Sequence, residues 1–234
     1  MRKRYLAPIL LLSLLLSLLF SSCAPRQEVL TGNTFALDTI IELKLYSYPS
    51  QYKGTLMQDA FNEITSLENT LSMHIEGSDV DQINKDAGIK PTKVSSLTYR
   101  VLSDSLFFSE KTNGLFDITT GPLIDLWAID PPNGHYPSQE ELDAVLPLID
   151  YHKIKFLGDN MIELADKGMI VNLGAIAKGT IADEIKAYLL GRGVKSALIN
   201  LGGNVLAVGS KPDGSSFVIG VQDPENTRGN YLLS

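Results

Sequence analysis

The chain has 234 residues, of which 44% are hydrophobic and 20% charged, and its 27 acidic and 20 basic residues give a net charge of −7. This composition is that of a folded protein with a packed core. An excess of negative charge repels phosphate backbones, so we expect no nucleic-acid partner. The single cysteine, Cys23, excludes intrachain disulfides and zinc sites made of several thiolates.

The N-terminus has the pattern of a secretory signal. Three basic residues (2–4) precede an apolar run over residues 5–20, which is shorter than the roughly 20 residues that a spanning helix needs. A spanning anchor is the alternative. The segment Leu19-Phe20-Ser21-Ser22-Cys23 resembles a bacterial lipobox, although Phe20 stands where that motif prefers a branched aliphatic residue. We therefore expect residues 1–22 to be a lipoprotein signal peptide and Cys23 to be lipidated. Residues 23–31 would then tether a folded domain, residues 32–234, to the outer side of the cell membrane.

Periodicity predicts the first elements of this domain. Apolar residues alternate over Thr34–Tyr46, which predicts one half-buried strand. Three- and four-residue steps predict a helix over Leu56–Leu71 and another that begins near Ser95 and ends at Asn113-Gly114. Residues 115–133 show neither period, and their Gly-Pro and Pro-Pro dipeptides predict a long ordered loop.

The second half contains shorter predicted elements. Ser138 and Glu141 have the spacing of a capping box for a short helix through Leu146. Further predictions, in chain order, are a hairpin around residues 158–160, a strand over 169–173, a glycine-bounded turn over 174–179, a helix to 191, and strands over 196–201, 205–208 and 217–222. This order indicates an α+β fold with a mixed, largely antiparallel sheet and flanking helices.

The turn from Gly174 to Thr180 is the first candidate for chemistry, because it joins a predicted strand to a helix whose first amide groups could face an anion. Lys178 precedes Gly179, whereas the lysine of a phosphate-binding P-loop follows the second glycine, and the dinucleotide pattern G-x-G-x-x-G does not occur. Two interpretations remain open: an anion or cofactor site, and a plain tight connection.

Other candidates are equally open on the residues alone. Gly202-Gly203-Asn204 would let a flat ligand lie against the backbone, or simply connect two strands. Asp117 is an acid beside hydroxyl groups, but a loop aspartate is more often a turn or capping group. The three histidines lack metal-ligand spacing, and the chain lacks a G-x-S-x-G nucleophile elbow.

Five segments, taken in this order, resemble the bacterial FAD:protein FMN transferases, the ApbE family. They are residues 35–39 (FALDT), Asn84 in QIN, residues 114–127 with Gly121-Pro122 and Leu126-Trp127, residues 172–179 (NLGAIAKG) and residues 201–204 (LGGN). The resemblance implies the ApbE-like fold from about Gly32 onward. It also implies a Mg2+-dependent enzyme that cleaves FAD at its pyrophosphate, transfers FMN to a threonine hydroxyl of an extracytoplasmic redox subunit and releases AMP.

The resemblance also implies site residues. Asn172 stands where an FAD-contacting aspartate is common in the family, and Leu37 where methionine is. The backbone carbonyl of Ala175 would ligate the metal. The FAD-binding positions are Leu37, His74, Leu115, Phe116, Asp117, Asn172, Lys178, Gly202, Gly203 and Asn204. The turn that contains Lys178 and the turn of paired glycines would together hold the diphosphate and the ring system. No residue is assigned to catalysis.

Family members continue beyond the position that corresponds to Ser234, through a late Asp/Thr pair that ligates the metal. We therefore expect this chain to be incomplete at its C-terminus, to bind Mg2+ poorly and to turn over slowly. The alternatives are a non-catalytic surface lipoprotein that binds a flavin or another nucleotide, an FAD pyrophosphatase that hydrolyses FAD to FMN and AMP, and a tethered interaction module without a nucleotide.

Overall fold

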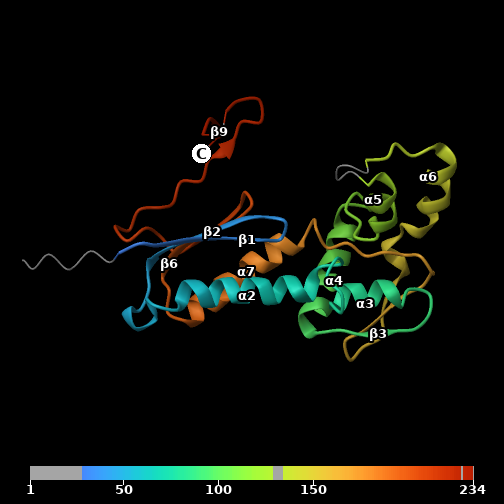
Figure 1. Ribbon diagram of the computed structural model, residues 1–234, viewed down its shortest axis with the longest axis horizontal. Coiled ribbons are helices and arrows are strands. Elements are labelled where there is room, and N and C mark those ends of the chain that lie inside the picture. Colours follow the sequence, from blue (N-terminus) through green and yellow to red (C-terminus); the bar gives the residue numbers. More distant parts are fainter. Residues whose placement is uncertain (1–27, 129–133, 228, 234) are drawn as a thin grey trace, which may run out of the picture.

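The computed structural model describes residues 28–128, 134–227 and 229–233. The expected signal peptide, Cys23 and most of the expected tether lie outside these residues. The described part forms two lobes: a four-stranded sheet with two long helices, and a second lobe of shorter helices and strands (Figure 1). None of the helices in the described ranges is long and apolar enough to cross a membrane.

The main sheet is antiparallel throughout, with the strand order β1-β2-β6-β7. Its strands are β1 (Leu30–Ala36), β2 (Thr39–Ser47), β6 (Ser196–Leu201) and β7 (Asn204–Val208). The prediction of one strand over residues 34–46 was wrong, because the chain turns at Leu37 and Asp38 and pairs with itself as a hairpin. Strand β1 also begins at Leu30, one residue before the expected end of the tether.

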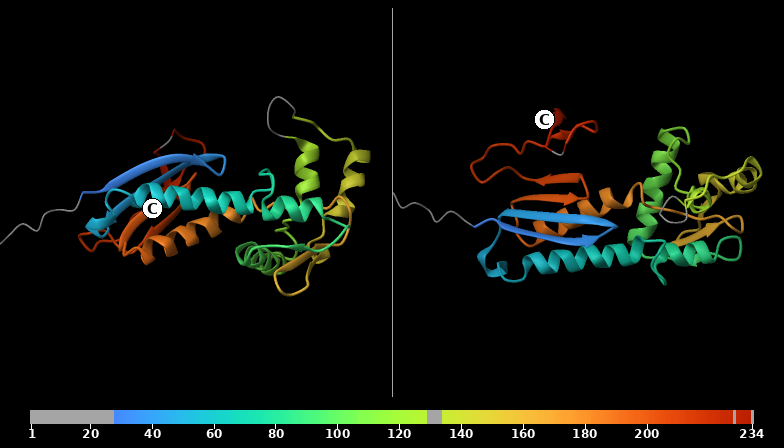
Figure 2. Two further views of the ribbon diagram at one scale, coloured as in Figure 1. Left: turned by 60° about the horizontal axis from the view of Figure 1, so that its bottom comes forward. Right: turned by 45° about the horizontal axis from the view of Figure 1, so that its top comes forward.

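Two helices cover one face of this sheet: α2 (Leu56–Leu71) and α7 (Ala177–Gly191), which lie side by side (Figure 2). The register places Ile41 opposite Leu201 and Leu43 opposite Ile199 on the covered face, and all four side chains are fully buried. Each helix contributes an apolar stripe to the same core: Leu56, Ala60, Ile64, Leu67 and Leu71 from α2, and Ile181, Ala182, Ile185 and Leu189 from α7.

The second lobe holds four helices and a small antiparallel sheet of order β3-β5-β4. Its elements are α3 (Asp79–Lys85), β3 (Thr92–Lys93), α4 (Ser96–Lys111), α5 (Gly121–Trp127), α6 (Gln139–Val145), β4 (Ile154–Phe156) and β5 (Met161–Leu164). Single-turn 3-10 helices occur at Ser50–Tyr52, Leu146–Leu148 and Tyr151–Lys153. A two-stranded hairpin, β8 (Val221–Gln222) and β9 (Tyr231–Leu233), follows the main sheet.

The structure confirms α2, α4, α6, α7, the β4–β5 hairpin, β6 and β7. The capping box is present: the Ser138 side chain accepts from the Glu141 N–H, and the Glu141 carboxylate accepts from the Ser138 N–H. This backbone hydrogen bond from Ser138 is the main cause that lowers the pKa of Glu141 from its ordinary value. Helix α3 and strand β9 were not predicted.

Three predicted elements differ from the structure. The expected loop over residues 115–133 contains α5, because Pro122 lies in the first turn, where a missing N–H costs nothing. Of the strand expected over residues 169–173, only Ile170 forms a bridge, in parallel with Thr120. Of the strand expected over residues 217–222, only β8 forms.

The two sides of the main sheet give a matched stability test. Ile41 is fully buried, whereas its neighbour Ile40 points to the other face and is 67% exposed. We expect Ile41→Ala to lower the free energy of unfolding by about 2–5 kcal/mol, because it leaves a cavity, and Ile40→Ala to lower it by less than about 1 kcal/mol. Urea unfolding of both variants measures the difference, and equal losses would contradict this register.

Candidate functional site

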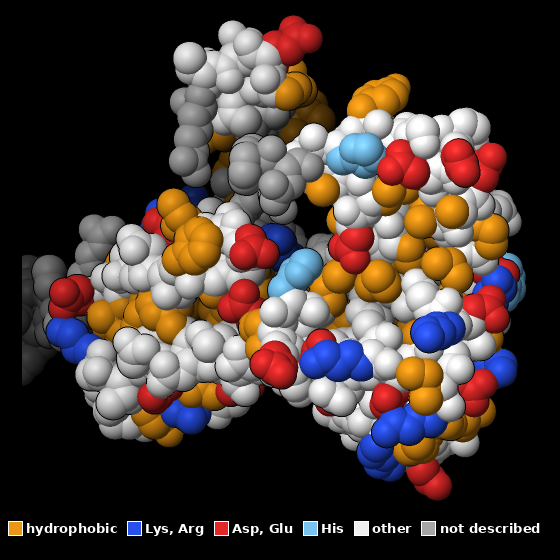
Figure 3. Space-filling model, turned by 45° about the vertical axis from the view of Figure 1, so that its right-hand side comes forward, with side chains coloured by type: hydrophobic (Ala, Val, Ile, Leu, Met, Phe, Trp, Pro, Cys, Tyr) orange, Lys and Arg blue, Asp and Glu red, His pale blue; other side chains and the backbone are white. Residues whose placement is uncertain are grey.

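A pocket of about 210 Å3 lies where the two lobes meet. Four segments far apart in the sequence line it: the β1–β2 turn, the C-terminal end of α2 with the loop that follows, residues 172–174, and the first turns of α7. Figure 3 shows this junction, where acidic, basic and histidine side chains gather over hydrophobic ones. This volume is below the roughly 300–1,000 Å3 that is typical of small-molecule and cofactor sites.

The β1–β2 turn is strained. Leu37 and Asp38 have φ values of 54° and 57°, in the left-handed region that glycine, asparagine and aspartate adopt more readily than leucine does. Such a conformation costs about 1–2 kcal/mol for an ordinary residue. The Leu37 N–H donates to the Glu68 Oε1 atom of α2 over 2.8 Å, which stabilises the turn at the edge of the pocket.

The opposite wall of the pocket is held by Asn84 of α3. Its Nδ2 atom donates to the Val171 carbonyl over 3.0 Å, and its Oδ1 atom accepts from the Val171 N–H over 2.7 Å. The side chain thus makes the two hydrogen bonds that a neighbouring strand would make. Val171, in the middle of the predicted strand, therefore pairs with a side chain and not with a neighbouring strand.

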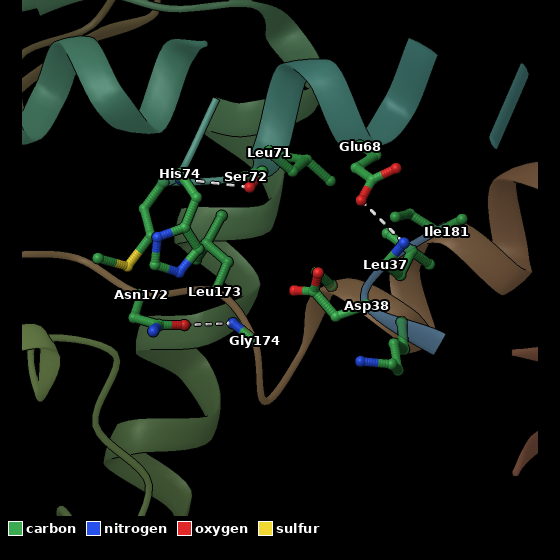
Figure 4. Close-up of a pocket in the computed structure, with 13 residues that line it drawn as sticks. Leu37, Asp38, Glu68, Leu71, Ser72, His74, Asn172, Leu173, Gly174 and Ile181 are labelled. Atoms are coloured by element: carbon green, nitrogen blue, oxygen red, sulfur yellow. Dashed lines mark hydrogen bonds between the residues drawn. The ribbon is translucent and has the colours of Figure 1, made fainter. Parts of the chain in front are cut away.

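Asn172, the next residue along this wall, is fixed on both sides. Its N–H donates to the Ile118 carbonyl over 2.8 Å, and its Oδ1 atom accepts from the Gly174 N–H over 2.7 Å. The latter bond closes a tight turn before α7. Figure 4 shows His74 and Asn172 on one side of the pocket and Leu37 on the other.

The first turn of α7 brings a positive charge to the pocket. Lys178 is half-buried there, and among the described residues its side chain has no hydrogen bond or ion pair. No side chain caps the helix N-terminus, and its first turn contains no acidic residue. The first amide groups of a helix attract anions, so lysine and helix act in the same direction.

Four of the sequence-predicted residues meet in this pocket: Leu37, His74, Asn172 and Lys178. The turn made by Gly202 and Gly203 lies outside it, next to the start of β2. The Gly202 N–H donates to the Ile40 carbonyl, and a Cβ at this position would collide with the side chain of Thr39. Asn204 begins β7 and does not line the pocket. The structure therefore does not place the two glycine-bearing turns around one shared cavity.

The predicted segment 115–117 also lies outside the pocket. Leu115 is 93% exposed, and Phe116 packs edge-on against Phe108. Asp117 accepts from the Thr119 N–H and hydroxyl over 2.7 and 2.6 Å, and from the Tyr151 N–H over 3.2 Å. In this structure, Asp117 therefore organises the loop whose next residue, Ile118, supports Asn172.

One predicted metal ligand, the backbone carbonyl of Ala175, falls within the described residues. Ala175 is exposed in the turn before α7 and does not line the pocket. The described ranges contain no group of three or more His, Cys, Asp or Glu side chains that could hold a metal ion. One backbone carbonyl does not satisfy a cation that requires near-octahedral coordination.

Two acidic residues of the pocket, Asp38 and Glu68, were not among the predicted site residues. Asp38 lay on the polar side of the alternating stretch, where it resembled a solvated strand residue. Glu68 lay on the polar side of the predicted helix, like other solvated glutamates. The hydrophobic periodicity does not distinguish either residue from a solvated one. The turn at Leu37 and Asp38 contains no glycine, so the sequence gives no sign of a turn at this position.

A family model described as the ApbE family matches residues 37–233. The chain belongs to the ApbE family. It is 29% identical over 223 residues to the FAD:protein FMN transferase of Treponema pallidum, covering 88% of this chain and 62% of that protein. It is 33% identical over 186 residues to that of Klebsiella pneumoniae, covering 79% and 55%. The chain thus spans about six tenths of the length of these curated ApbE relatives.

Solved structures confirm the α+β fold. The crystal structure of the ApbE protein of Thermotoga maritima matches with a TM-score of 0.79 at 27% identity, covering 88% of this chain and 66% of that one. The flavin transferase ApbE of Vibrio cholerae matches with a TM-score of 0.78 at 24% identity, covering 84% and 64%. The resemblance drawn from the five sequence segments is confirmed at the level of family and fold.

The Asn84 contact predicts a specific stability loss. Replacing Asn84 by alanine leaves the N–H and C=O of buried Val171 without partners, so we expect the free energy of unfolding to fall by about 1–3 kcal/mol. Asn69→Ala, at an exposed position of α2, is the matched control and should stay within about 0.5 kcal/mol. Equal unfolding midpoints of the two variants would show that Asn84 does not support the wall.

Proposed function

We propose that this chain is the flavin-binding part of an FAD:protein FMN transferase. The observation that carries the proposal is the convergence of Leu37, His74, Asn172 and Lys178, which come from four separate segments, on one pocket. Membership of the ApbE family and the names of the relatives support the same activity.

The pocket offers the two environments that FAD needs. Leu37, Met73 and Ala177 are partly exposed and supply apolar surface for a flat ring system, with buried Leu71, Leu173 and Ile181 beneath them. Lys178 and the uncapped N-terminus of α7 attract the negative diphosphate. The Glu68 carboxylate also lines the pocket, where it accepts from the Leu37 N–H.

In the proposed reaction, a threonine hydroxyl of the acceptor attacks the phosphorus on the FMN side of the pyrophosphate. The bridging P–O bond breaks, AMP leaves, and the hydroxyl proton passes to solvent. The chain's own groups bind and orient FAD for this step. The resemblance implies that the reaction needs Mg2+, and we propose this requirement without assigning the ion to the described residues.

We also propose a location and a partner. The leader pattern and Cys23 support a lipid-anchored protein on the extracytoplasmic or periplasmic face of the cell membrane. The acceptor would then be an extracytoplasmic subunit of a redox complex. Radiolabelled palmitate incorporated by wild-type protein and not by Cys23→Ala would test the anchor.

The activity test is to incubate the chain with FAD, Mg2+ and a threonine-containing acceptor, with and without EDTA. The proposal predicts FAD binding, seen as a change in flavin fluorescence, and equal amounts of AMP and acceptor-bound FMN. AMP with free FMN indicates a pyrophosphatase instead. Flavin binding without AMP indicates a non-catalytic flavin-binding protein, and no change in fluorescence contradicts the proposed site.

Substitution of Lys178 tests the proposed contact with the FAD diphosphate most directly. We expect Lys178→Ala to weaken FAD binding roughly 10- to 100-fold, because a charge-assisted contact contributes about 1.5–3 kcal/mol. Lys186→Ala removes the same charge from the same helix at a position that does not line the pocket, and should leave affinity within about twofold. Fluorescence titration measures both dissociation constants, and an equal loss in both variants would reject a local role for Lys178.

A further inference from the structure

The turn between β1 and β2 is a pocket wall that the local sequence does not favour. Leu37 and Asp38 are both left-handed; aspartate tolerates this region, whereas leucine does not favour it. Both residues line the pocket. A contact from outside the hairpin must therefore help to stabilise this turn conformation. Other conformations of the turn would displace Leu37 and Asp38 from the pocket wall.

Glu68 supplies that contact from a rigid element. It lies near the C-terminal end of α2, 31 residues further along the chain, and its Oε1 atom accepts from the Leu37 N–H over 2.8 Å. The neighbouring positions Ile64, Leu67 and Leu71 are buried in the core, which fixes the helix and the direction of the Glu68 side chain. Figure 4 shows this hydrogen bond at one side of the pocket.

Glu68 is a negatively charged residue in a pocket that is proposed to bind an anion. Two acidic side chains, Glu68 and Asp38, line a pocket in which the proposed ligand is an anion. Like charges repel, so a carboxylate here opposes the binding of an anion, and its presence calls for another role. The contact with the Leu37 N–H is what the structure shows this carboxylate to do.

We propose that Glu68 is a positioning residue, which holds the strained Leu37–Asp38 turn in the conformation that binds the flavin nucleotide. The role is structural preorganisation of the pocket, and Glu68 itself is not a catalytic group. The inference rests on the proposed function for its ligand, but the contact between Glu68 and the turn is independent of that function.

Two measurements test the role together: amide hydrogen exchange of Leu37 by NMR, and FAD affinity by fluorescence titration. In Glu68→Ala we expect Leu37 exchange to accelerate and FAD affinity to fall, each by about tenfold or more. Exchange at Ile199 in the core should stay unchanged. Glu68→Gln keeps an acceptor oxygen and should restore most of both properties. Glu63→Ala, on the same helix but outside the pocket, is the charge-matched control.

A glycine in the turn provides the decisive comparison. Asp38→Gly removes strain at the second turn position, where glycine is preferred, so the turn should depend less on Glu68. In that background, Glu68→Ala should change FAD affinity by less than about threefold. An equal loss in both backgrounds would overturn the proposal, as would acceleration at Leu37 and Ile199 alike.

The two proposals fail in different ways. If the wild-type chain binds no FAD, the proposed function fails, and Leu37 exchange alone decides whether Glu68 holds the turn. If the wild-type chain binds FAD and Glu68→Ala binds it equally well, the positioning role fails and the proposed function stands.

Discussion

The packing of α2 and α7 on one face of the main sheet is the interaction on which the pocket depends. Burial of the two apolar stripes against β2 and β6 fixes both helices. The C-terminal end of α2 and the N-terminal end of α7 consequently meet beside the β1–β2 turn (Figure 2). The positive end of the α7 dipole therefore faces the pocket together with Lys178.

The walls of the pocket are irregular backbone, and polar side chains from helices hold them in place. Asn84 of α3 pairs with both backbone groups of Val171, and Glu68 of α2 accepts from Leu37. Asp117 orders the loop beside Asn172. Sheet and helix periodicity build the core, whereas these few side-chain contacts shape the site. Binding residues can thus lie on loops without losing their geometry.

Elements with a clear period could be predicted from the sequence, because burial of one face of α2, α7 or β6 produces the pattern directly. The β1–β2 hairpin could not, because Leu37-Asp38 is not a recognised turn sequence and Glu68 supports it from far along the chain. The extended segment around Val171 was misassigned as a strand for a similar reason, since its partner is a side chain 87 residues away.

The site could be predicted only in part. Leu37, His74, Asn172 and Lys178 were found through the family resemblance, and the structure brings all four to one pocket. Residues 115–117 and 202–204 occur in the same family motifs, but here they support neighbouring backbone instead of lining the cavity. Sequence similarity shows which segments belong together in the fold. Whether a residue lines the cavity depends on the direction in which its turn points.

The central claim is that the pocket between the lobes binds FAD with its diphosphate at the N-terminus of α7. A crystal structure of the chain with bound FAD tests it most directly. The account predicts diphosphate density next to Lys178 and the ring system against the walls formed by Leu37 and His74. FAD bound at another surface, such as the opposite face of the main sheet, would contradict it.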